Sequence, residues 1–310
     1  MSWPSLLSRL PQVRGKYVEN APLADVTWLR VGGPAQMIYL PADEADLARF
    51  LAETPEDIPI TILGAGSNTL VRDGGVPGVT VRLTAPFGRV TAEDGARVRA
   101  GAAALDKKVA QTAAKAGIGG LEFFTGVPGL IGGALRMNAG CYDRETKDVL
   151  IEAAALDRLG RRIVVKANEL GYAYRHSEAP EDWIFVEALF RGVPDDADAV
   201  TARMDEITAR RESTQPIREK TSGSTFRNPD PPGTPDQRKA WKLIDAAGWR
   251  GKRIGGARFS EMHANFLIND GTATAADLEA VVEGARADIR AATGIDLEWE
   301  VKRIGVEKKK

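Results

Sequence analysis

Residues 59–68 run Pro59-Ile60-Thr61-Ile62-Leu63-Gly64-Ala65-Gly66-Ser67-Asn68, a short apolar segment followed directly by a glycine-rich turn. A β-branched apolar run broken by glycines is typical of a strand that ends in a tight loop. The loop begins like a dinucleotide-binding fingerprint, but Thr69 stands in place of the third glycine, and no lysine follows as in a P-loop. Its glycines would still let a phosphate approach the backbone, with Ser67 and Asn68 as extra donors. An ordinary turn between two strands is the alternative.

A second glycine-rich stretch occupies residues 125–140. It contains Gly126-Val127-Pro128-Gly129-Leu130-Ile131-Gly132-Gly133 and, a little later, Asn138-Ala139-Gly140. The glycine density is too high for a packed helix or strand, so we expect sharp turns or another molecule lying against the backbone. The alternative is a flexible surface loop, but such a loop would have little need for the apolar residues Val127, Leu130 and Ile131. Together the two stretches favour a ligand-binding region over two unrelated loops.

The rest of the chain mixes strands and helices without strict βαβ alternation, which indicates an α+β fold rather than a doubly wound sheet. We expect strands at residues 79–83 (half-buried, from their alternation), 183–190, 264–268 and 297–304, and a hairpin formed by 151–157 and 162–165. Helices are expected at residues 103–116, 195–212, 238–247 and 274–292. Thr274 should cap the start of the last helix, and Gly294 should lie just past its end.

Composition excludes several classes of protein. The 310 residues include 42 lysines and arginines against 43 acidic residues, so the net charge of −1 gives no reason to expect nucleic acid or an anionic membrane as a partner. A single cysteine, Cys141, cannot form an internal disulfide, and with only two histidines an all-protein metal site is not expected. No signal-peptide core or bilayer-length apolar run is present, so we expect a soluble, cytoplasmic protein without membrane insertion.

Polar residues that could carry chemistry lie in the second half of the chain. Arg175, taken alone, is most simply a structural ion-pair partner. Residues 221–229 concentrate hydroxyl groups, but a nucleophilic serine needs a base and no Gly-x-Ser-x-Gly elbow is present, so hydrolase chemistry is disfavoured. Glu298 and Glu300 are two apart and would share one face of a strand, for which a pair of exposed carboxylates is the ordinary explanation.

Six motifs occur in a fixed order and resemble those of one enzyme family. They are Gly64-Ala65-Gly66-Ser67-Asn68; Val127-Pro128-Gly129-x-x-Gly132 with Asn138-Ala139-Gly140; Gly171-Tyr172-Ala173-Tyr174-Arg175; Gly223-Ser224-Thr225-Phe226-Arg227-Asn228-Pro229; residues 243–269 with Ile254-Gly255-Gly256-Ala257 and His263-Ala264-Asn265-Phe266; and Leu297-Glu298-Trp299-Glu300-Val301. Any one motif is weak, but the ordered set is specific. Over residues 29–305 the chain resembles the UDP-N-acetylenolpyruvoylglucosamine reductase (MurB) family.

The resemblance implies a two-part FAD-binding domain of the vanillyl-alcohol-oxidase/PCMH type and a C-terminal α+β substrate-binding domain. The expected division is residues 1–84 (with 301–310 returning to them), 85–212 and 213–300. It further implies non-covalent FAD, NADPH as co-substrate, and reduction of UDP-N-acetylglucosamine enolpyruvate to UDP-N-acetylmuramate in peptidoglycan synthesis. As in such flavoenzymes generally, the cofactor supplies the hydride and the protein supplies binding, orientation and charge. We expect a monomer.

Residue roles also follow from the resemblance. Hydride from flavin N5 would add to the enolpyruvyl methylene carbon, Arg175 and Glu300 would stabilise the enolate-like intermediate, and Ser224 would deliver the proton. Glu300, rather than Glu298, matches the family glutamate before the valine. The expected substrate contacts are Tyr174, Lys220 and Asn228. The expected cofactor-binding residues are Gly64, Ala65, Gly66, Ser67, Asn68, Pro128, Gly129, Gly132, Gly133, Asn138 and Gly140.

One departure concerns the substrate diphosphate. Some family members close a tyrosine-bearing inserted loop over it, whereas residues 192–223 contain no tyrosine and have little spare length. The chain resembles the branch that lacks this loop. Two alternatives stay open: a flavin oxidase or dehydrogenase of the same fold acting on an alcohol or sugar, and a nucleotide-sugar binding protein that has lost turnover. Oxygen-consuming turnover with an alcohol would indicate the former, and a flavin not bleached by NADPH the latter.

Overall fold

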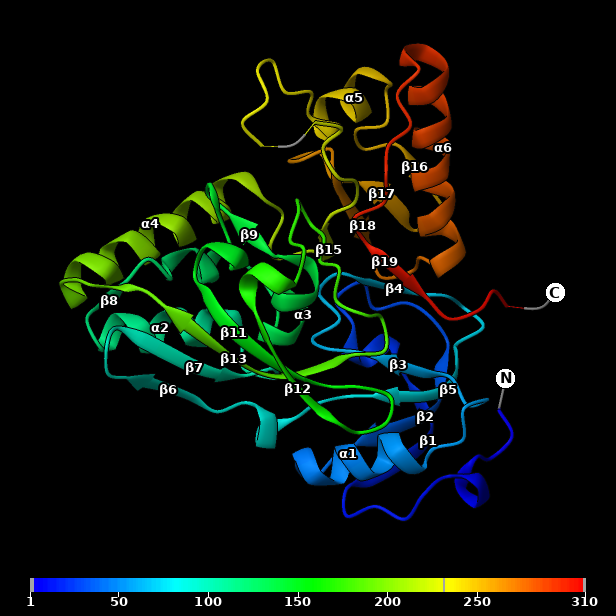
Figure 1. The fold of residues 1–310 in the computed structure, drawn as a ribbon. Helices are drawn as coiled ribbons and strands as arrows, with labels where there is room; N and C mark the ends of the chain where they lie inside the picture. The colour runs from blue at the N-terminus through cyan, green and yellow to red at the C-terminus, as the bar shows by residue number, and fades with distance from the viewer. Residues whose placement is uncertain (1–2, 231, 309–310) are drawn as a thin grey trace.

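The computed structural model describes residues 3–230 and 232–308, and its first part is a small mixed sheet (Figure 1). The strands lie in the order β1-β2-β5-β3, where β2, β5 and β3 run parallel and β1 is antiparallel to β2. Helix α1 packs on this sheet through Leu47, Phe50 and Leu51. The bounds are β1 Lys16–Pro22, β2 Pro34–Leu40, α1 Glu44–Glu53, β3 Ile60–Ile62, β4 Thr69–Val71 and β5 Val76–Val81.

Strand β5 corrects one expectation. The alternation of its residues predicts a half-buried strand, but Val79, Thr80 and Val81 are all fully buried. The reason is topological: β5 lies between β2 and β3 in a parallel arrangement, and parallel strands have both faces covered. An alternating pattern of residue types does not indicate that the second face of the strand is also covered.

The second part is an antiparallel sheet in the order β12-β11-β13-β7-β6, with α2, α3 and α4 packed against it or against its loops (Figure 1). The expected hairpin is confirmed as β11 and β12. The bounds are β6 Val90–Glu93, β7 Arg97–Gly101, α2 Asp106–Lys115, β8 Ile118–Gly119, α3 Ile131–Met137, β9 Gly140–Cys141, β10 Arg144–Glu145, β11 Leu150–Leu156, β12 Arg162–Lys166, β13 Ile184–Arg191, β14 Val193–Pro194 and α4 Ala197–Thr214.

Helix α3 is a second correction, because the glycine density of residues 125–140 argues against a packed helix. Of the two glycines inside this helix, Gly132 permits close packing against residue 102. A Cβ at Gly132 would lie 3.3 Å from the backbone oxygen of Ala102, to which the Gly132 N–H donates. The helix then ends at Asn138, whose left-handed φ of +45° is one that asparagine tolerates.

The third part is an antiparallel sheet in the order β15-β18-β17-β16, flanked by α5 and α6. Helix α6 has the expected ends: Thr274 forms a capping box with Asp277, and Gly294 adopts φ +73° after the last turn. Its face of Leu278, Val282 and similar residues is fully buried against the sheet. The bounds are β15 Lys220–Ser224, α5 Ala240–Ala246, β16 Arg253–Ile254, β17 Ala257–Phe259, β18 Phe266–Asn269 and α6 Ala275–Thr293.

The end of the chain returns to the first part. Strand β19 (Lys302–Ile304) pairs in parallel with β4, as the red and blue ribbons show in Figure 1. The final strand is therefore shorter than the expected 297–304. Residues 298–300 instead run beside residues 225–227, with a single antiparallel bridge between Phe226 and Trp299. This connection brings the C-terminal segment to the junction of all three parts.

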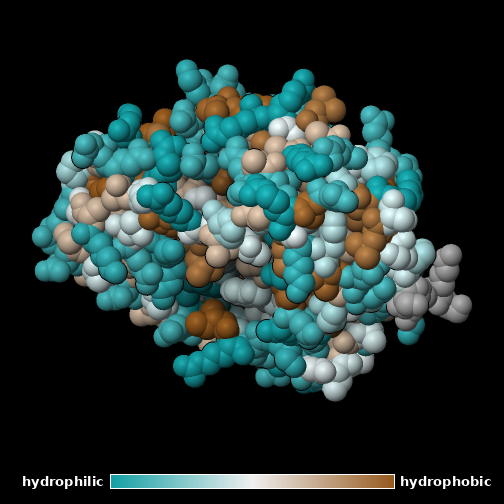
Figure 2. Space-filling view, turned by 90° about the horizontal axis from the view of Figure 1, so that it is seen from below, coloured by the Kyte–Doolittle hydropathy of each residue, from teal (hydrophilic) through white to brown (hydrophobic). Residues whose placement is uncertain are grey.

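The surface has no concentrated apolar face in the view of Figure 2, where hydrophobic residues are scattered among hydrophilic ones. Such scattering is normal for a water-facing surface. No helix in the described part of the chain is long and apolar enough to cross a membrane. Among residues 3–230 and 232–308, no group of three or more His, Cys, Asp or Glu side chains is placed to hold a metal ion.

Candidate active site

The two glycine-rich stretches meet in the structure. A Cβ built on Gly129 would lie 3.4 Å from the Ser67 Oγ, and one on Gly64 would lie 3.6 Å from the Leu130 side chain. The Asn68 amide lies 3.0 Å from the Met137 sulfur at the end of α3. Two loops separated by about sixty residues of chain therefore line one region, as is expected of a common binding site.

The first loop has the properties of an anion cradle. None of the backbone N–H groups of residues 64–68 donates a hydrogen bond to another residue in the described ranges. Gly66 has φ +64°, and a Cβ there would lie 2.8 Å from the Thr27 Cα, so only glycine fits. Unpartnered N–H groups on successive residues in turn conformations form concave sites for anions. The residues present thus fit the diphosphate of a dinucleotide such as FAD.

Several buried hydroxyl and carboxyl groups beside these loops also lack partners within the described residues. They are Thr27 Oγ1, Thr125 Oγ1 and both carboxyl oxygens of Asp106. Asp106 is fully buried in α2, and this burial holds the pKa of its carboxyl well above the ordinary value. Sequence reasoning missed Thr27 and Asp106, whose local sequence is ordinary and which only burial makes unusual, and it placed Thr125 in the second glycine-rich stretch without a role of its own.

A buried ion pair stands beside the cradle. The Arg175 Nε donates to the Glu300 Oε1 at 2.9 Å, and the Arg175 Nη2 donates to the Gly140 carbonyl at 2.9 Å. The side chains of Arg175 and Glu300 are only 20% and 13% exposed. The Asn68 amide donates to the backbone oxygen of Glu300 at 3.1 Å, which joins this pair directly to the first glycine loop.

The environment of this pair changes the pKa of its carboxyl group. Burial raises the pKa of Glu300 above the ordinary value, and the neighbouring Arg175 charge counteracts only part of that effect. The pair therefore consists of a cation that keeps its charge at any physiological pH and a carboxyl group whose proton affinity is raised. Such perturbed carboxyl groups beside a binding site are candidates for function.

Arg175 is held by an unusual backbone. It has φ +56° in a tight turn in which Ala173 and His176 exchange backbone hydrogen bonds at 3.1 and 3.2 Å. Asn138 fixes this turn by donating from its amide to the Ala173 carbonyl at 3.0 Å. The Asn138 side chain is thus used inside the protein, which favours a supporting role over the expected direct cofactor contact. Non-glycine residues in this conformation persist where their surroundings enforce them, often at functional sites.

Ser224 reaches the same junction from the third part. It is half-buried at the end of β15, and the next residue, Thr225, accepts hydrogen bonds from the Glu300 N–H at 2.8 Å and the Val301 N–H at 3.4 Å. The strand segment that carries Ser224 is therefore bonded to the segment that carries Glu300. Ser224, Arg175 and Glu300 come from three distant regions of the sequence, and tertiary structure brings the segments that carry them side by side.

Of the expected substrate contacts, Tyr174 lies beside Arg175, whereas Lys220 lies away from it. The Tyr174 ring lies under the Arg175 guanidinium, 5.0 Å from ring centroid to Cζ. Burial raises the pKa of the Tyr174 hydroxyl, and a hydrogen bond from the backbone N–H of Asn228 offsets part of this rise. Lys220 is exposed and pairs with Asn269, whereas Ser224 pairs with Phe266 at the other end of β15. Lys220 is therefore not brought to the Arg175 cluster.

The two glutamates do not form the exposed pair that their spacing suggests. The Glu298 side chain is 75% exposed and lies 3.6 Å from Arg227, while Glu300 is 13% exposed and pairs with Arg175. The expectation of an exposed pair fails because residues 298–300 lie outside a regular strand. Their different surroundings favour Glu300 as the residue of the buried cluster.

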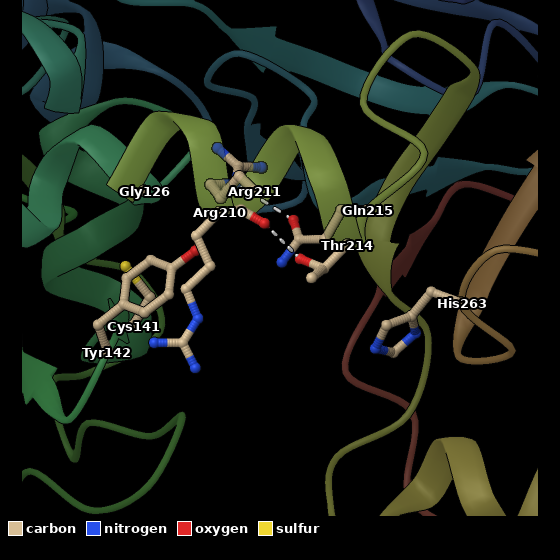
Figure 3. A pocket seen from close by; sticks show the side chains of 8 residues that line it. All are labelled: Gly126, Cys141, Tyr142, Arg210, Arg211, Thr214, Gln215 and His263. Carbon is tan, nitrogen blue, oxygen red and sulfur yellow. Dashed lines mark hydrogen bonds between the residues drawn. The ribbon is translucent and has the colours of Figure 1, made fainter. Parts of the chain in front are cut away.

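No inserted loop covers the site from the segment after β13. Residues 192–219 form β14, the long helix α4 and a short connection into β15. At the end of α4, Arg211 lines a cavity together with Gly126 and Cys141 (Figure 3).

Comparison with known proteins places the chain in a family. A family model described as "UDP-N-acetylenolpyruvoylglucosamine reductase, C-terminal domain" matches residues 215–304, and one described as "FAD binding domain" matches residues 35–166. A UDP-N-acetylenolpyruvoylglucosamine reductase from Maricaulis maris is 70% identical over 301 residues, covering 97% of this chain and 96% of that protein. The one from Phenylobacterium zucineum is 60% identical over 307 residues, covering 98% and 99%.

A solved structure agrees with these relatives. The crystal structure of UDP-N-acetylenolpyruvylglucosamine reductase (MurB) from Thermus caldophilus superimposes with a TM-score of 0.79 at 33% identity, covering 95% of this chain and 100% of that one. The expected α+β fold, a two-part FAD-binding domain followed by a C-terminal domain, is confirmed. The chain belongs to the UDP-N-acetylenolpyruvoylglucosamine reductase family, whose members are FAD-dependent oxidoreductases with NADPH as co-substrate.

Proposed function

We propose that this protein reduces UDP-N-acetylglucosamine enolpyruvate to UDP-N-acetylmuramate in the cytoplasm, as a monomer, through the Arg175, Glu300 and Ser224 side chains. The observation that carries the proposal is the buried Arg175–Glu300 pair, bonded on one side to Asn68 of the cofactor cradle and on the other to the Ser224 segment. We also propose the three-part division of the chain at residues 84 and 212, with residues 301–310 returning to the first part, because the three main sheets follow it and β19 pairs with β4.

The glycine stretches would hold the cofactor. Residues 64–68 would bind the FAD diphosphate with their unpartnered N–H groups, and residues 128–133 would lie against the rest of the molecule. Bound FAD, once reduced by NADPH, supplies the hydride. The protein's own contribution is to orient the enolpyruvyl group and to stabilise the charge that develops on it.

Arg175 is suited to the developing negative charge. Its guanidinium is permanently charged, largely shielded from water and fixed by two hydrogen bonds. A pre-oriented cation in a water-poor site stabilises an enolate-like oxygen more strongly than a solvated one would. We propose that Glu300 assists by holding Arg175 in place and by sharing a proton with the substrate carboxyl group, which its raised pKa permits.

Ser224 would deliver the proton that completes the reaction. A serine hydroxyl is a weak acid, but a carbanionic intermediate is a strong base, and proton transfer between positioned groups is fast. Tyr174 and Asn228 would contact the substrate next to Arg175. A contact by Lys220 would involve the end of the substrate remote from Ser224, because the two residues stand at opposite ends of the five-residue strand β15, roughly 13 Å apart.

Anaerobic half-reactions test the proposal. Holoenzyme mixed with NADPH should lose its flavin absorbance, and the absorbance should return when the enolpyruvyl nucleotide is added. Ser224→Ala should keep the first step and slow the second by about 10²- to 10⁴-fold, the usual contribution of a positioned proton donor. Equal loss in both steps would make Ser224 structural. Bleaching of the oxidised flavin by an alcohol, without reoxidation by the enolpyruvyl nucleotide, would favour an oxidase or dehydrogenase.

A further inference from the structure

The position of Ser224 is set by its backbone. Its hydroxyl group forms no hydrogen bond with any group of residues 3–230 and 232–308. Strand β15 pairs with β18 as far as Ser224, which lies opposite Phe266. Just before Ser224 the pairing is irregular: two residues of β15 face one residue of β18, and Gly223 has φ +79°. Bulges of this kind redirect the side chain that follows them, so the chain after Ser224 must be held firmly to fix its direction.

Asn265 holds the two residues that follow Ser224. Its side-chain Oδ1 accepts from the Phe226 N–H at 2.9 Å, and its Nδ2 donates to the Phe226 carbonyl at 2.8 Å. Its backbone carbonyl accepts from the Thr225 N–H at 2.7 Å. Asn265 is only 4% exposed. One buried residue thus makes three hydrogen bonds to the backbone directly after Ser224.

The Asn265 amide takes the place of a strand residue. Strand β18 begins only at Phe266, and the chain before it is turned, since the Phe266 N–H donates to the His263 carbonyl at 3.0 Å. A side-chain amide carries a donor and an acceptor side by side, as a peptide group does. Phe226 is 1% exposed, so its N–H and carbonyl groups need partners inside the protein. The Asn265 side chain supplies both partners.

The other edge of the same segment is bonded to the C-terminal part of the chain. The Thr225 carbonyl accepts from the Glu300 N–H at 2.8 Å, and the Arg227 N–H donates to the Glu298 carbonyl at 2.9 Å. Residues 225–227 are therefore held on both edges. Because Glu300 belongs to the second edge, the two sets of bonds together determine where the Ser224 side chain stands relative to the buried ion pair.

We infer that Asn265 is a positioning residue for proton delivery: its buried amide continues the pairing where β18 ends, and thereby fixes the Ser224 hydroxyl relative to the Arg175–Glu300 pair. The inference rests on the proposed function, because it concerns the step that Ser224 is proposed to perform. Asn265 acts through the backbone of residues 225 and 226. Its removal should therefore affect reoxidation of the flavin by the enolpyruvyl nucleotide and leave reduction by NADPH unchanged.

Asn269 offers a matched control in the same strand. It is the last residue of β18, is also 4% exposed, and lies opposite Lys220, at the end of β15 remote from Ser224. Its Nδ2 donates to the Leu29 carbonyl at 2.7 Å, and its Oδ1 accepts from the Gly271 N–H at 2.7 Å. Asn265→Ala and Asn269→Ala should lower the melting temperature to a similar extent, because each leaves buried backbone groups without partners. Stability alone therefore does not distinguish the two variants, whereas kinetics should.

Anaerobic stopped-flow on the holoenzymes follows the two half-reactions separately. Asn265→Ala should slow the maximal rate of reoxidation by about 10- to 100-fold, since a misplacement of about 1 Å can cost about 10²-fold. The concentration of enolpyruvyl nucleotide at half-maximal rate should change by less than about threefold, because the lost interaction acts on the reacting step and not on binding. Flavin reduction by NADPH should keep its rate. Asn269→Ala should leave both half-reactions close to those of the unmodified protein.

A double-mutant cycle with Ser224→Ala separates positioning from a purely structural role. Once the Ser224 hydroxyl is absent, adding Asn265→Ala should slow reoxidation further by less than about threefold, because coupled residues do not act additively. A purely structural role would give the same factor in both backgrounds, and that result would overturn the inference. Equal slowing of both half-reactions by Asn265→Ala would also overturn it.

The cycle also distinguishes this inference from the proposed function. Normal reoxidation in Ser224→Ala would count against the proposed role of Ser224 and against the inference with it. Slow reoxidation in Ser224→Ala, with a further full loss on adding Asn265→Ala, would overturn the inference alone. Asn265→Asp, which keeps the size of the side chain and the acceptor for the Phe226 N–H, supplies the same cycle if Asn265→Ala does not fold.

Discussion

The sharpest test of the active-site assignment compares Glu300→Gln with Glu298→Gln. The two substitutions remove the same charge two residues apart, but the first acts on a side chain 13% exposed and the second on one 75% exposed. The 2.9 Å bond between Arg175 and Glu300 is charge-assisted. Such bonds contribute about 1.5–3 kcal/mol, against about 0.5–1.5 kcal/mol for neutral ones, so Glu300→Gln should cost about 1–2 kcal/mol of stability.

The thermal and kinetic consequences differ between the two variants. At roughly 2–4 °C per kcal/mol, the melting temperature of Glu300→Gln should fall by about 2–8 °C. Glu298→Gln should stay within about 0.5 kcal/mol of the unmodified protein, as surface substitutions usually do. In anaerobic stopped-flow, Glu300→Gln should keep flavin reduction by NADPH and slow reoxidation by the enolpyruvyl nucleotide by about 10²- to 10⁴-fold. An equal or larger kinetic loss in Glu298→Gln would refute the assignment.

Three other changes probe the cradle and its surroundings. Gly66→Ala should destabilise the protein and weaken FAD binding, because φ is +64° and the new Cβ would lie 2.8 Å from Thr27. Gly133→Ala, whose Cβ meets nothing within 4 Å, should keep the stability of the unmodified protein. Urea unfolding measures the stability of each variant, and flavin fluorescence titration measures its FAD binding. Asp106 has a raised pKa from burial, so folding favours its protonated form and stability should fall as pH rises from its unfolded toward its folded pKa. Asp106→Asn should lose less stability between pH 5 and pH 8 than the unmodified protein. Equal losses of stability in the two proteins would contradict this explanation. Arg175→Lys should keep FAD binding and slow reoxidation, since lysine cannot donate to Glu300 and to the Gly140 carbonyl in the same fork geometry; reoxidation at the normal rate would show that only charge matters there.

The sequence alone determined the local features of this protein. The capping signals at Thr274 and Gly294 set the ends of α6, and the residue pattern of 151–165 predicts the hairpin of β11 and β12. These are effects of near neighbours in the chain, which propensity and turn chemistry describe well. The ordered motifs likewise indicate the family, and with it the roles expected of Arg175, Glu300 and Ser224, because the order of short motifs is a property of the chain itself.

Tertiary structure decided what depends on burial and on distant segments. Local patterns suggest that β5 is half-buried, that residues 131–137 form no helix, and that Glu298 and Glu300 are equivalent; packing reversed all three. Desolvation is a property of the folded interior, and no short stretch of sequence specifies it.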